Sequence, residues 1–270
     1  MAQLHFALNH MVAPQLSVQE FFRLATSLGI DAVEIRNDLA NSAILDGTSP
    51  DAVARAAREH RLTILSINAL QLFNDWSPER KEEAKELIGY ATACGAKALV
   101  LVPKNDGTGR ADGERQKNLR QSLIELKPLL DAANIIGLVE PLGFEICSLR
   151  SKAEAAAAID ALEARSTFRL VHDTFHHLLA GEDRLFADLT GLVHISGVSD
   201  PSVSLSEMRD PHRVLVDGKD RLDNLGQMKA LLAAGYRGPF SFEPFAAEVH
   251  GLEDPSSSLR ASMDFLTART

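Results

Sequence analysis

The sequence predicts an α/β protein that folds as a single (β/α)8 barrel over residues 1–270. Eight short apolar runs alternate with segments whose apolar residues recur at the spacing of an amphipathic helix. Strict alternation indicates parallel strands joined by right-handed helical crossovers. Eight such units in 270 residues fit the usual length of this barrel. Since no low-complexity linker divides the chain, we expect one domain.

The expected strands are short runs rich in β-branched and other apolar residues, which suits strands buried on both faces. In chain order they are Leu4–Leu8, Ala32–Ile35, Thr63–Ile67, Ala98–Val102, Ile135–Val139, Phe168–Val171, Leu192–Ile195 and Phe240–Phe242.

The expected helices lie between these strands, and several carry terminal signals. Ser17, Ser77 and Ser151 each stand where a capping hydroxyl would begin a helix, and several segments end in glycine or asparagine. The segments are Ser17–Gly29, Pro50–His60, Ser77–Gly95, Glu114–Asn134, Ser151–Ala164, Gly181–Leu189, Asn224–Gly235 and Pro255–Ala268.

A doubly wound open sheet is the main structural alternative. That fold places a GxGxxG turn after its first strand when it binds a dinucleotide, and no such turn follows the first apolar run here. Eight units are also more than an open sheet of this kind normally needs. The barrel is therefore the favoured fold.

Composition narrows the classes of partner. A formal net charge of -9 disfavours nucleic acids, whose binding proteins concentrate basic residues on one face. The chain has no apolar run long enough for a membrane span and no basic segment followed by an apolar one at its start. We expect a cytoplasmic protein with a small-molecule substrate and no membrane partner.

Four apolar runs in the second half of the chain end in residues that bind metal ions. Glu140 follows IIGLV, Asp173 ends FRLVHD, His194 lies in LVHIS and Glu243 ends FSFE. The carboxyl ends of barrel strands meet on one face, where catalytic groups gather. Carboxylates with one imidazole suit a divalent ion such as Mn²⁺, Mg²⁺, Co²⁺ or Zn²⁺. The pattern predicts one divalent metal site, although each acidic residue alone is more often a helix cap or a solvated turn.

Several stretches resemble the xylose isomerase-like TIM barrel superfamily of sugar isomerases and epimerases. They are GIDAVEIR, LSINALQLFN, VHDTFHHLLAG, VHISGV, DPHRVLVDGKDRLD and FSFEPF, and within the superfamily they look most like the inosose (2-keto-myo-inositol) isomerases. The resemblance covers nearly all of the chain. It implies that the four strand-end residues hold the metal ion.

The resemblance also implies two substrate-binding residues. His176 of the DTFH run and Arg213 of DPHR match residues that contact substrate oxygens near the metal. An imidazole can donate to a developing oxyanion, and a guanidinium adds fixed positive charge. Two alternatives stay open, namely that His176 orients a metal ligand and that Arg213 caps a loop. VHISGVSD and Pro211-His212 depart from the family pattern, which leaves the substrate less certain than the metal site.

The residue types suit isomerisation. An isomerase removes a proton next to a carbonyl and returns one to the neighbouring carbon through an enediolate, whose charge a divalent metal stabilises. The resemblance implies that Glu140 and Glu243 are both metal ligands and proton carriers, and which removes the first proton stays open. We expect a metal-dependent isomerase or epimerase of a keto-polyol or ketose, with inosose as the leading substrate.

Other functions remain open. A dehydratase of an inosose or related polyol, or a free-ketose 3-epimerase, would use the same metal site. A sugar-binding protein without activity is a different class, against which the complete ligand set argues. A related barrel class cuts DNA at abasic sites, but it needs more histidines and a basic groove, which the net charge of -9 disfavours. Monomers and homo-oligomers are both compatible with the sequence.

Further residues at strand ends are weaker candidates. Glu34 and Arg36 could line the mouth of the barrel or form an ion pair that supports its rim. Asn9 and Asn68 have similar positions, and His10 lies just beyond the first strand.

A third group lies near the expected site in sequence. The segment KNDGTGR lacks the spacing of a phosphate loop and is interpreted as a mobile cover over the site, with Lys104 as its residue most worth testing. Phe73 and Trp76 could form an apolar wall of the pocket or pack in the core. His172 and His177 are interpreted as packing or solvent-facing residues.

Overall fold

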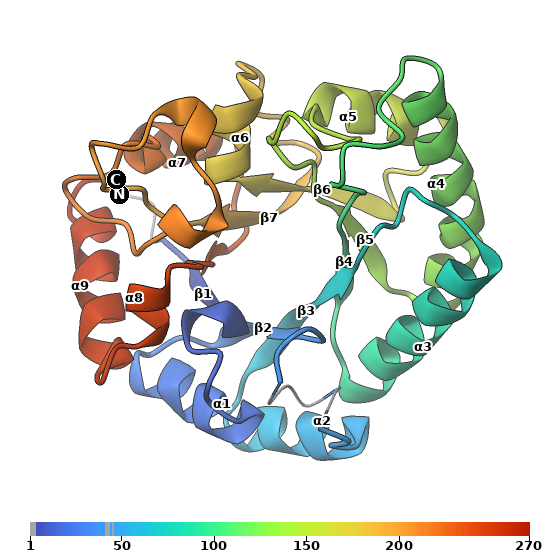
Figure 1. Ribbon diagram of the computed structural model, residues 1–270. Helices are drawn as coiled ribbons and strands as arrows, with labels where there is room; N and C mark the ends of the chain where they lie inside the picture. The colour runs from blue at the N-terminus through green and yellow to red at the C-terminus, as the bar shows by residue number, and fades with distance from the viewer. Residues whose placement is uncertain (1–3, 41–43, 45) are drawn as a thin grey trace.

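The protein is a closed barrel of parallel strands surrounded by helices (Figure 1), seen in a computed structural model that describes residues 4–40, 44 and 46–270. The strands follow one another in chain order around the barrel, and the first pairs with the eighth to close it. The predicted fold class is confirmed.

Each strand overlaps the apolar run predicted for it. The strands are β1 (Phe6–Asn9), β2 (Ala32–Arg36), β3 (Thr63–Leu70), β4 (Ala98–Leu101), β5 (Ile136–Val139), β6 (Phe168–Asp173), β7 (Thr190–Ile195) and β8 (Phe240–Phe242).

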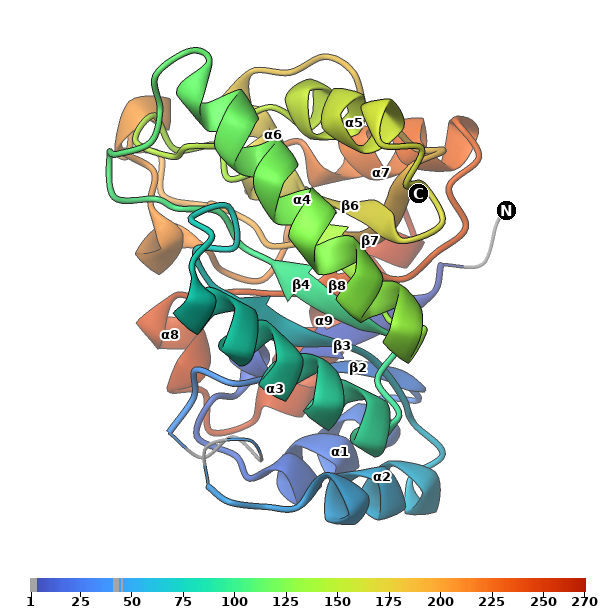
Figure 2. The same ribbon diagram turned by 90° about the vertical axis from the view of Figure 1, so that its right-hand side faces the viewer.

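The helices cover the outside of the barrel, and α3 and α4 pack side by side along it (Figure 2). The α-helices are α1 (Val18–Ser27), α2 (Pro50–Glu59), α3 (Pro78–Cys94), α4 (Glu114–Ala133), α5 (Lys152–Ala161), α6 (Thr174–Ala180), α7 (Asn224–Ala233), α8 (Ala247–His250) and α9 (Pro255–Thr267). Short 3-10 turns lie at η1 (His10–Val12), η2 (Leu205–Glu207) and η3 (Asp210–His212).

The predicted helix starts are confirmed at three serines. The hydroxyls of Ser17, Ser77 and Ser151 accept hydrogen bonds from backbone N–H groups in the first turns of α1, α3 and α5. Each bond satisfies an N–H that has no partner within its helix.

The helix predicted over Gly181–Leu189 is wrong. The helix after β6 is α6, which begins directly at Thr174 and ends before Gly181. The carboxylate of Asp173 accepts hydrogen bonds from the N–H groups of Phe175 and His176, so the last strand residue is also the helix cap. Gly181 then adopts the left-handed conformation (φ 67°) that ends a helix.

Apolar side chains form two layers around the strands. The main core lies between strands and helices and includes Phe21, Phe22 and Phe168. A smaller cluster of strand residues alternates with it along β4 to β7 and contains Val100, Leu138, Val171 and Leu192. Within the described residues, no helix is both long and apolar enough to cross a lipid bilayer.

Candidate functional site

The strand alternation brings the four predicted metal ligands to one end of the barrel interior. Side chains two residues apart on a strand share a face. Glu140, Asp173 and His194 each stand two residues beyond a member of the smaller cluster, namely Leu138, Val171 and Leu192. Glu243 follows β8 in the same way, two residues after the buried Ser241.

The four side chains form one buried cluster. One ligand atom from each of Glu140, Asp173, His194 and Glu243 lies within 4.8 Å of the others. The Nδ1 atom of His194 is 2.9 Å from Oε1 of Glu140 and 3.2 Å from Oε2 of Glu243. The structure therefore brings together all four residues that the sequence singled out.

Arg213 contacts this cluster and also binds the loop residue Asp210 through its Nη1. Its Nη2 donates to Oδ2 of Asp173 at 2.6 Å and to Oε2 of Glu243 at 3.2 Å, and its Nε donates to Ser196. The side chain is almost fully buried, so its charge is compensated by these carboxylates. It also lines the cavity above the cluster.

Glu34 lies on the other side of His194. Its carboxylate oxygens are 3.1 and 3.2 Å from Nε2 of His194, and it accepts hydrogen bonds from Ser66, Asn68 and Ser241. Since Nε2–H donates to Glu34, Nδ1 faces the clustered carboxylates. A carboxylate behind a ligating histidine fixes the ring and its tautomer.

Glu243 is held by residues from the first strands. Arg36 Nη1 donates to Oε1 of Glu243 at 2.9 Å, and Asn9 Nδ2 donates to the same atom at 3.1 Å. The other end of the Arg36 guanidinium binds Asp38 through two hydrogen bonds. Arg36 thus forms ion pairs with Asp38 and Glu243, whereas Glu34 pairs with His194.

A cavity of about 340 Å³ opens above the cluster. Glu140, Glu243 and Arg36 line it, whereas Asp173 and His194 do not. His176 also lines it, and its buried Nδ1 has no hydrogen-bond partner among the described residues. This Nδ1 is therefore a buried polar atom for which the described residues supply no partner.

The two glutamates differ in their tendency to ionise. Burial raises the pKa of Glu140. Burial also opposes ionisation of Glu243, but His194, Arg213 and Arg36 hold the pKa of that carboxyl well below its usual range. Burial opposes protonation of His194, yet Glu243, Glu34 and Glu140 raise its pKa well above the usual value.

The donor set fits a divalent metal ion. Three carboxylates and one imidazole form a hard-ligand set of the kind that binds Mg²⁺, Mn²⁺ or Zn²⁺. Arg213 brings positive charge to Asp173 and Glu243, and a bound divalent ion would add to it. Metal binding would displace the proton from Nδ1 of His194, because only the neutral ring is a ligand.

Several weaker candidates have structural roles. Lys104 binds Asp75 at 2.7 Å and does not line the 340 Å³ cavity, whereas Asn105 and Asp106 of the same segment do. Phe73 is fully buried in the main core, and Trp76 packs against that core. The core interpretation of these two aromatic residues is therefore confirmed.

The other candidate histidines, His10, His172 and His177, pack within the structure. His10 stacks on Phe21 and its Nε2 bonds the carbonyl of Leu16. The Nδ1 atoms of His172 and His177 each lie 2.8 Å from the ammonium of buried Lys152. Sequence reasoning missed Lys152, since a lysine in the first turn of a helix carries no signal of burial.

Comparisons with known proteins agree with the fold. A family model described as xylose isomerase-like TIM barrel matches residues 22–269. A human protein named putative hydroxypyruvate isomerase is 27% identical over 240 residues, which span 78% of this chain and 84% of that protein.

Two solved structures share the whole fold. A xylose isomerase domain containing protein from Salmonella typhimurium is 34% identical with a TM-score of 0.89, covering 98% of this chain and 96% of that one. The IOLI protein, whose crystal structure has a bound zinc atom, is 21% identical with a TM-score of 0.88, covering 98% of each chain.

Proposed function

The chain belongs to the xylose isomerase-like TIM barrel family, and from that premise we propose that it is a divalent-metal-dependent isomerase of a keto-polyol or ketose, with inosose as the leading substrate. The proposed metal ligands are Glu140, Asp173, His194 and Glu243, which form the buried cluster. When bound, the ion supplies Lewis-acid stabilisation of the negative charge that develops next to the reacting carbon.

One observation carries the proposal. Of the four clustered residues, Glu140 and Glu243 line the cavity, whereas Asp173 and His194 lie behind them. Two carboxylates that both reach a ligand-sized cavity suit the removal and return of a proton. Asp173 and His194 then hold the metal without carrying a proton.

The two glutamates have different starting states. Glu243 remains ionised because Arg36 and Arg213 donate to its two oxygens, so it accepts the proton from the carbon next to the carbonyl. The Oε2 atom of Glu140 has no hydrogen bond within the described residues, so this oxygen is free to carry a proton to the neighbouring carbon.

His176 and Arg213 position the substrate. The imidazole of His176, which lines the cavity, binds a substrate hydroxyl. Arg213 keeps Asp173 and Glu243 in place and presents positive charge to oxygens in the cavity. Both roles match the substrate-binding assignment implied by the resemblance.

The reaction is tested by following proton exchange in ²H₂O with NMR. Inosose, free ketoses, hydroxypyruvate and 3-dehydroshikimate are each incubated with the metal-supplemented protein. We expect isomerised product with deuterium at the carbon that receives the proton, and complete, reversible loss of turnover on chelation.

The same experiment separates the alternatives. Loss of a β-hydroxyl would identify a dehydratase, and inversion at the exchanging carbon would identify an epimerase. Full turnover in chelator-treated protein, or exchange without any interconversion, would contradict the proposal. Glu154→Gln, a change of a helix carboxylate that pairs with Arg115 away from the cluster, is the matched control and is expected to have no effect.

A further inference from the structure

A second cavity of about 640 Å³ adjoins the 340 Å³ cavity of the candidate site. The two share Asn105, Phe144 and Asp210 as lining residues. The larger cavity, which we term the outer chamber, lies between the segment after β5 and the segment after β7. A substrate held over the clustered glutamates could therefore extend into it.

Part of the wall of the outer chamber is apolar and exposed to water. Ile146 is 49% exposed and Leu205 is 46% exposed, and both line the chamber. The buried ring of Phe144 forms the wall that it shares with the candidate site. Large apolar side chains left exposed around one cavity indicate a binding surface rather than a random surface composition.

The charges of the outer chamber balance. Arg150 and Arg209 line it together with Glu145 and Asp210. The two arginines also donate to backbone carbonyls, Arg150 to Gly143 and Leu179 and Arg209 to Ser206 and Met208. Two cations beside two carboxylates give little net attraction for an anionic group, so the chamber favours a neutral occupant.

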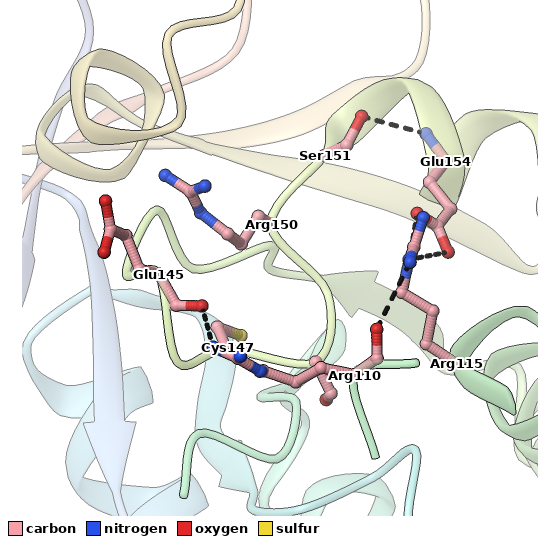
Figure 3. A pocket seen from close by; sticks show the side chains of 8 residues that line it. Arg110, Arg115, Glu145, Cys147, Arg150, Ser151 and Glu154 are labelled. Atoms are coloured by element: carbon pink, nitrogen blue, oxygen red, sulfur yellow. Dashed lines mark hydrogen bonds and ion pairs between the residues drawn. The ribbon is translucent and has the colours of Figure 1, made fainter. Parts of the chain in front are cut away.

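A neighbouring hollow of about 310 Å³ is lined by three arginines, Arg110, Arg115 and Arg150, and could be mistaken for an anion site (Figure 3). There Arg110 donates to the carbonyl of Glu145, and Arg115 donates to Glu154 and to the carbonyl of Arg110. These donors are used within the protein. The guanidinium of Arg150 points away from Arg110 and Arg115 (Figure 3), so this hollow is not a cluster of three converging arginines.

We propose that the outer chamber binds a neutral ring joined through oxygen to the reacting sugar or polyol. The substrate would then be a keto-sugar or keto-polyol with a cyclic substituent, whose apolar face packs on Phe144, Ile146 and Leu205. This inference rests on the proposed function for the reacting end of the substrate, but the binding of the ring can be measured without turnover.

The binding test compares phenyl β-D-glucopyranoside with methyl β-D-glucopyranoside, using saturation-transfer NMR and titration in the presence of Mg²⁺. We expect the phenyl glycoside to bind about tenfold more tightly, because burial of the ring removes apolar surface from water. Leu205→Asp should abolish that preference. Ile124→Asp is the matched control, since Ile124 is an equally exposed residue (45%) on α4 that does not line the chamber.

Two results would overturn the inference. One is equal binding of the two glycosides to the unmodified protein. The other is a Leu205→Asp variant that still prefers the phenyl glycoside over the methyl glycoside. If light scattering then shows that the change only disrupts self-association, Leu205 belongs to an interface between copies of the chain and the inference is likewise overturned.

A kinetic comparison separates this inference from the proposed function. For the ketose or polyol that exchanges its proton, an O-benzyl derivative should have a lower KM, and Leu205→Asp should raise KM for that derivative alone. If no compound exchanges, the proposed function fails, whereas the glycoside binding result still decides whether the chamber accepts a ring.

Discussion

The two halves of the barrel contribute differently to the site. The half from β5 to β8 supplies the four clustered residues, whereas the half from β1 to β4 supplies the hydrogen bonds that hold two of them. The first-half residues are Asn9, Glu34, Arg36, Ser66 and Asn68, of which Asn9 and Arg36 donate to Glu243, and Glu34 accepts from His194, Ser66 and Asn68. The second half provides the proposed ligands, and the first half adds hydrogen bonds that hold Glu243 and His194.

The proposed ligands and the residues that hydrogen-bond to them are therefore far apart in sequence. Glu34 and His194 are separated by 160 positions, and Arg36 and Glu243 by 207. Closure of the barrel through pairing of β1 with β8 brings the two ends of the chain together. The predictions below test whether the halves differ in function as they do in position.

The largest loss of activity is expected from substitutions in the half from β5 to β8. Glu140→Gln and Glu243→Gln should each reduce kcat by about a thousandfold or more, because each removes a proposed proton carrier as well as a charged ligand. Turnover and far-UV circular dichroism are measured together. Near-normal turnover in either folded variant would remove that glutamate from the mechanism.

A pH effect on stability is expected in the first half. Burial lowers the pKa of His10 from 6.5 to about 4. Because the unfolded chain binds the proton more readily, the stabilisation is present above pH 6.5 and is lost as the pH falls toward 4. A shift of this size corresponds to roughly 3 kcal/mol of unfolding free energy.

Urea unfolding of the unmodified protein and of His10→Gln, between neutral pH and about pH 4, measures this loss. As the pH falls, the unfolding free energy of the unmodified protein should decrease more than that of His10→Gln. A pH-independent difference would show that His10 titrates normally. Since His10 is not one of the four clustered residues, the difference between the two proteins reports on the stability of the barrel and not on the proposed metal site.

Glu34→Gln tests the support of the metal site directly. The change removes the negative charge behind Nε2 of His194 while keeping the shape of the side chain. We expect metal affinity to fall about tenfold to a hundredfold, as for other partners of ligating histidines. Calorimetric titration with Zn²⁺ measures it, and Glu86→Gln on the exposed face of α3 is the control. Unchanged affinity would mean that the two halves are not coupled through His194.

The smallest effect is expected at the cavity wall. His176→Ala should raise KM about tenfold with a smaller change in kcat, because a single hydrogen bond to substrate is lost. Steady-state kinetics on the substrate identified by proton exchange measures both constants. A fall in metal affinity with KM unchanged would instead favour the alternative role of His176 as a residue that orients a ligand.

Much of the fold could be predicted because the barrel repeats a simple pattern. Each strand was located by its apolar run, and serine caps located the starts of α1, α3 and α5. The helix after β6 was misplaced to Gly181–Leu189 because Asp173 was interpreted as a metal ligand and not also as a cap. The Oδ1 atom of Asp173 caps the helix while its Oδ2 accepts from Arg213, and the sequence pattern suggested neither contact.

The cluster itself could be predicted, but its supports could not. Glu140, Asp173, His194 and Glu243 stand out as polar residues at the ends of apolar strands. Glu34 ends a similar strand, yet its contact with His194 depends on which strands face each other across the barrel. A usable signal was the repeated polar residue on the inner face of β2 and β3, at Glu34, Ser66 and Asn68. That the clustered residues bind metal stays a prediction, as does the single-domain boundary.

Asp173 ends β6 and Thr174 begins α6, so no loop separates the strand from the helix. An insertion at this corner would move both the proposed ligand and the first turn of the helix that it caps. Relatives with new substrates should therefore lengthen the segments after β5 and β7, where the outer chamber lies, and leave the corner after β6 at constant length. The connection after β6 is thus expected to stay constant in length, while the connections after β5 and β7 are expected to vary.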